Sequence, residues 1–229
     1  KSAGVSRKTY NAALGNFQPD PEVLEKASNQ AEFKQEIWEY LHNAVGEKRI
    51  NEGRQLLAIH SDLLDQIERR YGVDRHVVVA IWGMESSYGG VFEYPDRVRG
   101  TIRSLATLAY DCRRSEFFTG HLYGALTMVD RGMLNPNAKG AAHGEIGQTQ
   151  FLPGNALKYG VDGDGNGRVD MIRSQADALA STANFLRAHG WQRGAGYQPG
   201  QPNFRAIQGW NAASVYQQAI AIMAKEIDG

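Results

Sequence analysis

The spacing of the apolar residues constrains the fold of this chain more than any other feature. Over much of the sequence they recur at steps of three and four, and this period of about 3.6 residues predicts amphipathic helices with one buried face. Residues 101–112 predict a further helix, and Gly72 predicts the end of the first stripe. We therefore expect a mainly α fold whose core is built from these stripes. The clearest stripes are Leu56, His60, Leu63, Ile67 and Tyr71, then Phe118, Leu122, Ala125 and Val129, then Leu179, Ala183 and Leu186, and finally Val215, Ala219, Ile222 and Met223.

Two stretches break this pattern. Residues 1–30 are polar and are interrupted by Gly15, Pro19 and Pro21, which predicts an extended N-terminal arm laid over the body. Residues 132–170 are rich in Gly, Asn, Pro and Asp and form the longest irregular stretch. We therefore expect one unit over residues 1–229, made of an arm (1–30), a helical body (31–134 and 177–229) and a loop-rich lobe (135–176).

Composition excludes several classes of function. Acidic and basic side chains balance, so the formal net charge is zero and no basic surface for nucleic acid is indicated. No apolar run reaches the roughly 20 residues of a membrane span, and no signal-peptide pattern opens the chain. The single cysteine, Cys112, rules out an internal disulfide framework, and we expect its thiol to be buried.

Glu85 is the only acidic residue between Val77 and Gly89, and it is the strongest candidate for chemistry. Asp74 can cap a helix that begins here, although three consecutive valines suit a strand equally well. A carboxyl group behind apolar side chains loses hydration, which raises its pKa. An acid that is still protonated near neutral pH can donate a proton to the leaving oxygen of a glycosidic bond. The alternative is a glutamate at a helix end that faces solvent.

An aspartate-rich segment, residues 162–170, has the spacing of a calcium loop. Ca²⁺ takes several oxygen ligands, and a glycine at the sixth place permits the turn that brings those oxygens together. Arg173 occupies the twelfth place instead of the usual glutamate, so Asp177 would have to close an EF-hand-like loop. We expect a structural calcium ion here; the alternative is a turn without an ion. The other candidate ligands are Asp162, Asp164, Asn166, the carbonyl of Arg168, and Asp170.

Other side chains are suited to a sugar polymer. Gln150 offers an amide to sugar hydroxyls from a glycine-rich loop. Arg113 and Arg114 can hold a carboxylate or a peptide stem, or can be surface charges that pair with an acid such as Glu116. The aromatic ring of Trp210 can stack on a sugar face or belong to the core, and the same alternatives apply to the ring of Tyr216 six positions later.

Together, these segments resemble the MltB-type (family 3) lytic murein transglycosylases. The order and spacing of the motifs carry the resemblance, which covers the chain from residue 30 to its end. It departs from the family at three positions, because the family usually has Ser where Ala141 stands and Tyr where Phe185 and Trp210 stand. The matching segments are 80–89, 104–118, 144–153 with the aspartate-rich loop that follows, 183–191 and, more loosely, 210–216.

The resemblance implies a lysozyme-like α domain with a loop-rich inserted lobe, and Glu85 as the sole acid and base. The enzyme would cleave the MurNAc–GlcNAc β-1,4 bond of peptidoglycan without water, leave 1,6-anhydromuramic acid ends, and need no cofactor for chemistry. A hydrolytic muramidase and an inactive peptidoglycan-binding scaffold remain alternatives, because Glu93, Asp96, Glu116 and Glu145 stay open as second acids. The residues that would line the cleft are Arg113, Arg114, Gln150, Phe151, Asn211 and Tyr216.

The resemblance also implies a compartment. Peptidoglycan lies outside the cytoplasmic membrane, so we expect a periplasmic protein of a Gram-negative bacterium whose signal segment has been removed. We expect a monomer whose partner is the glycan strand, with a cell-wall synthase or a secretion machine as a possible further partner.

Overall fold

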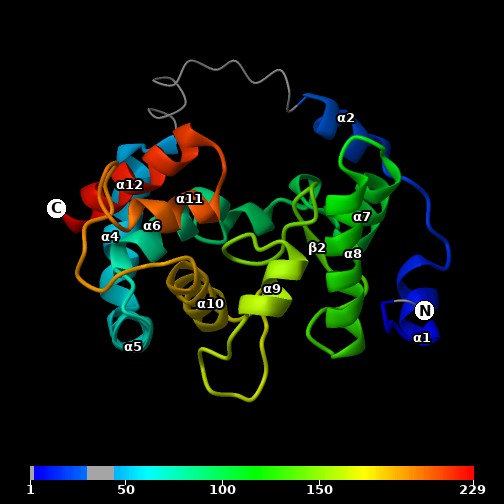
Figure 1. The fold of residues 1–229 in the computed structure, drawn as a ribbon, viewed down its shortest axis with the longest axis horizontal. Helices are drawn as coiled ribbons and strands as arrows, with labels where there is room; N and C mark the ends of the chain where they lie inside the picture. The colour runs from blue at the N-terminus through cyan, green and yellow to red at the C-terminus, as the bar shows by residue number, and fades with distance from the viewer. Residues whose placement is uncertain (1–2, 30–43) are drawn as a thin grey trace.

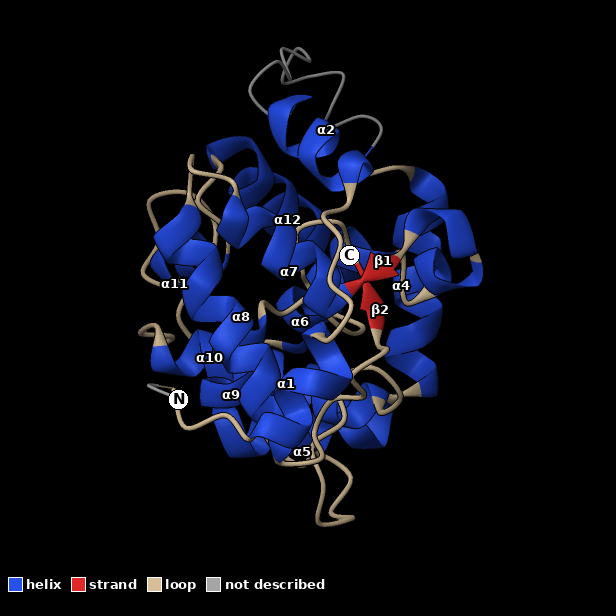
Figure 2. Ribbon diagram, turned by 90° about the vertical axis from the view of Figure 1, so that its right-hand side faces the viewer, coloured by secondary structure: helices blue, strands red, loops and turns tan. Residues whose placement is uncertain are grey.

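The computed structural model describes residues 3–29 and 44–229, and they form a mainly helical molecule (Figures 1 and 2). The predicted start of the helical body at residue 31 lies outside the described residues. Two short 3₁₀ turns, η2 (Gly90–Glu93) and η3 (Pro95–Arg97), follow α6. The helices are α1 (Arg7–Leu14), α2 (Pro21–Asn29), α4 (Glu47–Ile59), α5 (Ser61–Tyr71), α6 (Arg75–Ser86), α7 (Thr101–Tyr110), α8 (Ser115–Asp130), α9 (Pro153–Tyr159), α10 (Gln175–Ala188), α11 (Phe204–Trp210) and α12 (Ser214–Asp228).

Helix α6 lies at the centre of one half of the molecule. It packs against α12, α4, α10 and α5, and residues 77–83 are all buried. A helix that is apolar on every side is stable only when other elements surround it. Asp74 caps this helix by accepting a hydrogen bond from the backbone N of His76 at 2.8 Å. The valines therefore form a helix, because the cap and the surrounding helices decide between the two structures that their sequence allows.

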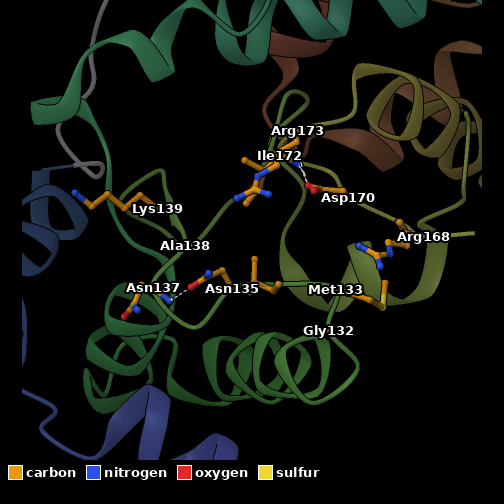
Figure 3. Close-up of a pocket in the computed structure, with 12 residues that line it drawn as sticks. Gly132, Met133, Asn135, Asn137, Ala138, Lys139, Arg168, Asp170, Ile172 and Arg173 are labelled. Carbon is orange, nitrogen blue, oxygen red and sulfur yellow. Dashed lines mark hydrogen bonds between the residues drawn. The ribbon is translucent and has the colours of Figure 1, made fainter. Parts of the chain in front are cut away.

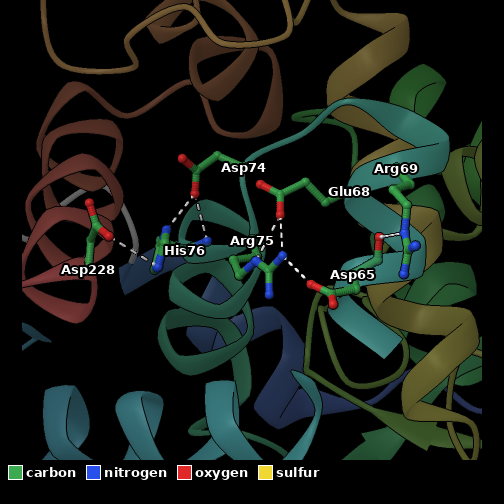
Figure 4. A network of polar contacts seen from close by, with 7 residues as sticks. All are labelled: Asp65, Glu68, Arg69, Asp74, Arg75, His76 and Asp228. Carbon is green, nitrogen blue, oxygen red and sulfur yellow. Dashed lines mark hydrogen bonds and ion pairs between the residues drawn. The ribbon is translucent and has the colours of Figure 1, made fainter. Parts of the chain in front are cut away.

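A polar network fixes the beginning of α6 against its neighbours (Figure 4). The Nε of Arg75 donates to Oε2 of Glu68 on α5 at 2.8 Å. His76 lies between Asp74, at 2.8 Å from Nδ1, and Asp228 at the end of α12, at 3.3 Å from Nε2. Three helices are thus joined at the end of α6 that lies opposite Glu85.

The apolar stripe from Leu56 to Tyr71 belongs to two helices, α4 and α5, which the spacing of the apolar residues did not distinguish. Helix α4 ends before His60, whose φ of −100° and ψ of 21° leave the helical range, and α5 begins directly after it. The ring of His60 meets Trp82 edge-on at 5.6 Å between centroids. The stripe stays continuous because both helices face the same core. Gly72 ends α5 in the left-handed conformation, with a φ of 71°, as predicted.

The described part of the N-terminal arm packs against α7 and α8, and it is not extended. It contains α1 and α2, because each begins with a good capping signal. The hydroxyl of Ser6 caps α1 and also donates to Asp130 at the end of α8 at 2.6 Å. Asp20 precedes Pro21, a residue favoured at the first helical position, and the backbone N of Asp20 donates to Oγ1 of Thr107 on α7 at 3.0 Å.

The other half of the molecule packs α8 against α7, α9 and α1. Two residues of β1 (Arg99–Gly100) pair antiparallel with β2 (Lys139–Gly140). Helix α9 lies within the stretch predicted to be irregular; Pro153 begins it and supplies the fixed φ of a first helical residue. Cys112, predicted to be buried, is exposed in the turn between α7 and α8. Within the described ranges, no helix has the length and apolar character of a membrane span.

Candidate active site

Glu85 lies in the last turn of α6, where the chain leaves the helix in an unusual conformation. Ser87, Tyr88 and Gly89 all have positive φ, at 50°, 58° and 91°. Two consecutive non-glycine residues in this region cost free energy, so the surrounding structure must hold them there. The backbone after Ser86 therefore turns sharply away from the helix axis and leaves the acid at a helix end.

Hydrogen bonds hold the residues on both sides of the acid. The hydroxyl of Ser86 donates to the carbonyl of Gln148 at 2.5 Å, and Nε1 of Trp82 donates to Oε1 of the same glutamine at 3.0 Å. The hydroxyl of Tyr88 donates to the carbonyl of Arg49 at 2.8 Å. The glycine-rich loop predicted from sequence thus holds the end of α6 in place through Gln148.

Glu85 opens into a cavity of about 160 Å³. Its walls combine apolar rings with amide side chains, and it contains two carboxyl groups. Such a mixture of apolar surface and a few polar groups is typical of a ligand site. The lining residues are Glu85, Glu145, Gln150, Phe151, Leu152, Asn155, Phe185, Trp210 and Asn211.

Two hydrogen bonds reach the carboxyl group of Glu85. Nε1 of Trp210 donates to Oε1 at 2.8 Å, and the side chain of Tyr216 forms the second hydrogen bond. The pKa of Glu85 is raised from 4.5 to about 7. Burial is the largest cause of this rise, and the charge of nearby Glu145 adds to it, while both hydrogen bonds lower the pKa. Glu85 can therefore be protonated or ionised near neutral pH, as a group that both donates and accepts a proton must be.

Glu145 is a second carboxyl group in this cavity. Burial raises its pKa, against hydrogen bonds from the backbone at Glu145 and His143 that lower it. Its Oε2 is buried and has no hydrogen-bond partner in the part of the chain that the structure describes. A buried carboxyl oxygen without a partner is unusual, because such an atom normally keeps a hydrogen bond.

The structure gathers four of the six residues predicted to bind sugar around Glu85. Gln150, Phe151 and Asn211 line the cavity, and Tyr216 contacts the acid itself. Gln150 has a φ of 59°, and its Nε2 donates to the carbonyl of Gly147 at 2.8 Å. Its amide is thus fixed by its own loop and is held at the cavity wall.

Arg113 and Arg114 do not line this cavity. Arg113 forms an ion pair with Asp111 at 2.6 Å, and the guanidinium carbon of Arg114 lies 4.3 Å from the centre of the Phe117 ring. The pairing with Glu116 that the sequence suggested is replaced by these contacts. Both arginines lie in the exposed turn between α7 and α8.

Sequence reasoning did not single out two residues that act on the acid, Trp210 and Glu145. Trp210 was read as a stacking or core ring, yet its N–H contacts Glu85 across 125 positions of sequence. Glu145 was one of four acids left open. Its place in the glycine-rich loop with Gln150 was the only available signal, because that loop was already a candidate for ligand contact.

The aspartate-rich loop brings three carboxylates together. Asp162, Asp164 and Asp177 each place a carboxylate oxygen within 4.8 Å of the others. Asp177 is fully buried and accepts hydrogen bonds from the backbone N of Gly163 and of Asp170, both at 2.7 Å. The donor set is oxygen only, so the chemistry of these residues fits a calcium ion.

The remaining predicted ligands lie near this cluster with other contacts. Oδ1 of Asn166 accepts from the backbone N of Arg168 at 2.8 Å. Oδ1 of Asp170 accepts from the backbone N of Ile172 and of Arg173, both at 3.0 Å. These side chains close tight local turns, and the EF-hand-like arrangement of the loop stays a prediction.

A larger cavity, of about 580 Å³, lies between the segment after α8 and the aspartate-rich loop (Figure 3). Lys139, Arg168 and Arg173 line it, and its one acid is Asp170. It shares no lining residue with the cavity of Glu85.

The mainly helical fold, with the half-buried acid Glu85 at the end of its central helix, is the arrangement expected of a lysozyme-like class of protein. Comparisons with known proteins agree with this class. The family model described as Transglycosylase SLT domain matches residues 1–201. Membrane-bound lytic murein transglycosylase B of Escherichia coli (strain K12) is 35% identical over 156 residues, which cover 63% of this chain and 41% of that relative. The chain thus spans less than half the length of this curated relative.

Solved structures are similar over nearly the whole chain. SltB3 from Pseudomonas aeruginosa in complex with NAG-NAM-pentapeptide has a TM-score of 0.92 and 33% identity, over 100% of this chain and 76% of that one. The same protein in complex with NAG-anhNAM-pentapeptide has a TM-score of 0.91. The E. coli lytic transglycosylase SLT35 in complex with calcium shares the fold, with a TM-score of 0.83 at 23% identity over 98% of this chain and 88% of that one.

This chain therefore belongs to the SLT-domain transglycosylase family. The family match confirms the resemblance to the MltB-type lytic murein transglycosylases that the sequence motifs predicted.

Proposed function

We propose that this chain is a peptidoglycan lytic transglycosylase that cleaves the MurNAc–GlcNAc β-1,4 bond, with Glu85 as acid and then base. The observation that carries the proposal is the carboxyl group of Glu85, whose pKa lies at about 7 in a cavity of aromatic and amide side chains. Relatives support the substrate, since SltB3 has been solved with NAG-NAM-pentapeptide and with NAG-anhNAM-pentapeptide.

The proposed reaction needs one carboxyl group and no water. Protonated Glu85 donates its proton to the bridging oxygen while the bond between that oxygen and C1 of the muramic acid breaks. The C6 hydroxyl oxygen of the same sugar bonds to C1 and closes the 1,6-anhydro ring. Ionised Glu85 takes the proton of that hydroxyl, which returns the acid to its starting state. Gln150, Phe151 and Asn211 would hold the sugars during these steps.

The test is Glu85→Gln, which keeps the shape of the side chain and removes the titratable proton. We expect loss of at least 10²-fold in the release of anhydro-muropeptides from purified sacculi, roughly the contribution of general acid–base catalysis. Products are measured by mass spectrometry without prior reduction, and circular dichroism checks the fold. Wild-type turnover by this variant would contradict the role of Glu85.

A muramidase is the second candidate, because Glu145 lies in the same cavity as Glu85. A hydrolase of this kind uses two carboxyl groups, one of which activates water or attacks the sugar. Product mass separates the two candidates, since a hydrolysed end is heavier than an anhydro end by one water. We favour the transglycosylase because SltB3, which is similar over the whole of this chain, has been solved with the anhydro sugar of NAG-anhNAM-pentapeptide.

A calcium ion at the aspartate-rich loop is the proposed structural metal. Asp162, Asp164 and Asp177 would bind it through carboxylates, and Asn166, the carbonyl of Arg168 and Asp170 would complete the set. The ion would supply charge neutralisation within the loop and no step of bond cleavage. SLT35, which shares the fold, has been solved with calcium.

The proposed substrate sets the proposed compartment. Because peptidoglycan lies outside the cytoplasmic membrane, we place this chain in the periplasm of a Gram-negative bacterium, the kind of organism from which the relatives come. We propose that it acts as a monomer on the glycan strand; a cell-wall synthase or secretion machine would be a further partner. Sedimentation of the chain with and without soluble glycan fragments tests whether it is a monomer.

A further inference from the structure

Trp210 contacts the acid through a group that can only donate a hydrogen bond. Its Nε1 lies 2.8 Å from Oε1 of Glu85. An indole N–H has no lone pair available to accept a proton, unlike the hydroxyl of a tyrosine or serine. Oε1 must therefore be an acceptor in both protonation states of Glu85 for this bond to persist.

The indole ring is itself fixed from two sides. Phe151 from the glycine-rich loop meets it edge-on at 5.1 Å and 88°, and Phe185 of α10 meets it at 5.1 Å and 86°. Phe185 is stacked in turn on His189, at 3.8 Å between centroids. The direction of the indole N–H is thus set by the packing of these rings and does not change with the protonation state of Glu85.

We propose that Trp210 is a positioning residue that keeps Oε1 of Glu85 as the acceptor and so directs the acidic proton to Oε2. This inference rests on the proposed role of Glu85. Oε1 keeps the hydrogen bond from the indole N–H and has the character of a carbonyl oxygen. Oε2 is the oxygen that gives and takes the proton. Tyr216, whose hydroxyl can donate or accept, adapts to either state without imposing one.

The arrangement gives Trp210 a measurable effect on the titration of Glu85. Its hydrogen bond favours the ionised form and lowers the pKa of Glu85 against burial, which raises it to about 7. Without the indole N–H, the acid would hold its proton to higher pH. Its carboxyl group would also be free to rotate and to carry the proton on either oxygen.

The test is Trp210→Phe, which keeps an aromatic ring between Phe151 and Phe185 and removes the donor. We expect the pH at which Glu85 ionises to rise by about one unit, since a bond to a charged group is worth roughly tenfold in the equilibrium. Turnover on soluble glycan fragments should fall roughly tenfold at its best pH, with KM changed less than about threefold, because an aromatic ring stays in the cavity wall.

The ionisation is read directly from the ¹³C signal of the glutamate carboxyl group in selectively labelled protein, assigned by its absence in Glu85→Gln. This titration needs no activity, so it tests the position of Trp210 even if the proposed reaction fails. Trp191→Phe is the matched control, because Trp191 packs on Tyr197 and lines no part of the Glu85 cavity. It should leave titration and turnover unchanged.

An unchanged or lowered ionisation pH in Trp210→Phe overturns the proposal, and so does an equal rise in Trp191→Phe. If Trp210→Phe does not fold, Trp210→Tyr takes its place. Its hydroxyl can accept as well as donate, so we expect a smaller rise and a lower turnover. A Trp210→Tyr protein that titrates and turns over like the wild type would also overturn the proposal, because a donor-only group would then be unnecessary.

Discussion

At the scale of single residues, the site is a balance of opposing effects on one carboxyl group. Burial and Glu145 raise the pKa of Glu85, while hydrogen bonds from Trp210 and Tyr216 lower it. The balance lies at about 7, so small changes in any neighbour alter the protonation of the acid at working pH. None of these neighbours is close to Glu85 in sequence.

This balance predicts how activity depends on pH. Cleavage begins with protonated Glu85, so we expect turnover to fall as pH rises past about 7, the pKa of that group. The measurement is kcat/KM for soluble glycan fragments between pH 5 and 9, values that bracket the transition by roughly two units on either side. A rate that stays level up to pH 9 would show that Glu85 is not the acid.

The same shift predicts a stability effect. Glu85 ionises at about 7 in the folded chain and near 4.5 when unfolded, so the folded state binds more protons in between and stability falls as pH rises through that window. Glu85→Gln has no titratable group at this position, so its stability does not fall in this window for that reason. We expect the variant to gain stability relative to wild type, by at most about 3 kcal/mol above pH 7 and by about nothing below pH 4. Urea unfolding at both pH values measures it.

At the scale of elements, the end of α6 carries backbone strain. Ser87 is exposed and left-handed, with a φ of 50°. Glycine adopts this conformation without the steric cost, so we expect Ser87→Gly to stabilise the fold by about 0.5–1 kcal/mol. Gln218→Gly, at an exposed position inside α12, should destabilise it by a similar amount. Chemical denaturation compares the two, and stabilisation by both would refute the assignment of strain.

The aspartate-rich loop depends on Asp177, which is buried and accepts two backbone hydrogen bonds. Asp177→Asn places a donor where at least one backbone N–H points, so we expect a loss of about 2 kcal/mol. Calcium should raise the melting temperature of the wild type and not that of the variant. Asp96→Asn, at an exposed position outside the loop, serves as the control. Equal stabilisation of wild type and Asp177→Asn by calcium would contradict the proposed site.

Much of this architecture was predictable from local signals, and the failures have physical causes. The helices with clear stripes were found, and so was the stop at Gly72, because periodicity and capping are local. The break at His60 was missed because two helices that face one core share one stripe. The arm was taken as extended because its prolines and glycine were read as breakers, whereas Pro21 begins a helix.

At the scale of the whole molecule, the site exists only when distant segments meet. Glu85 comes from α6, Glu145 and Gln150 from the loop before α9, Phe185 from α10, and Trp210 from α11. A single sequence predicts each segment but not which side chains face each other. Glu85 was predictable because its apolar neighbours lie in the same helix, while the N–H of Trp210 reaches it only through tertiary packing.

The exposed thiol of Cys112 has a practical consequence for experiments on the intact chain. It is the only cysteine in the sequence and lies in the turn between α7 and α8, outside the lining of the Glu85 cavity. A maleimide dye would therefore attach at a single place without any engineered substitution. Individual fluorescent molecules could then be followed as they land on a cell-wall fragment, stay and leave.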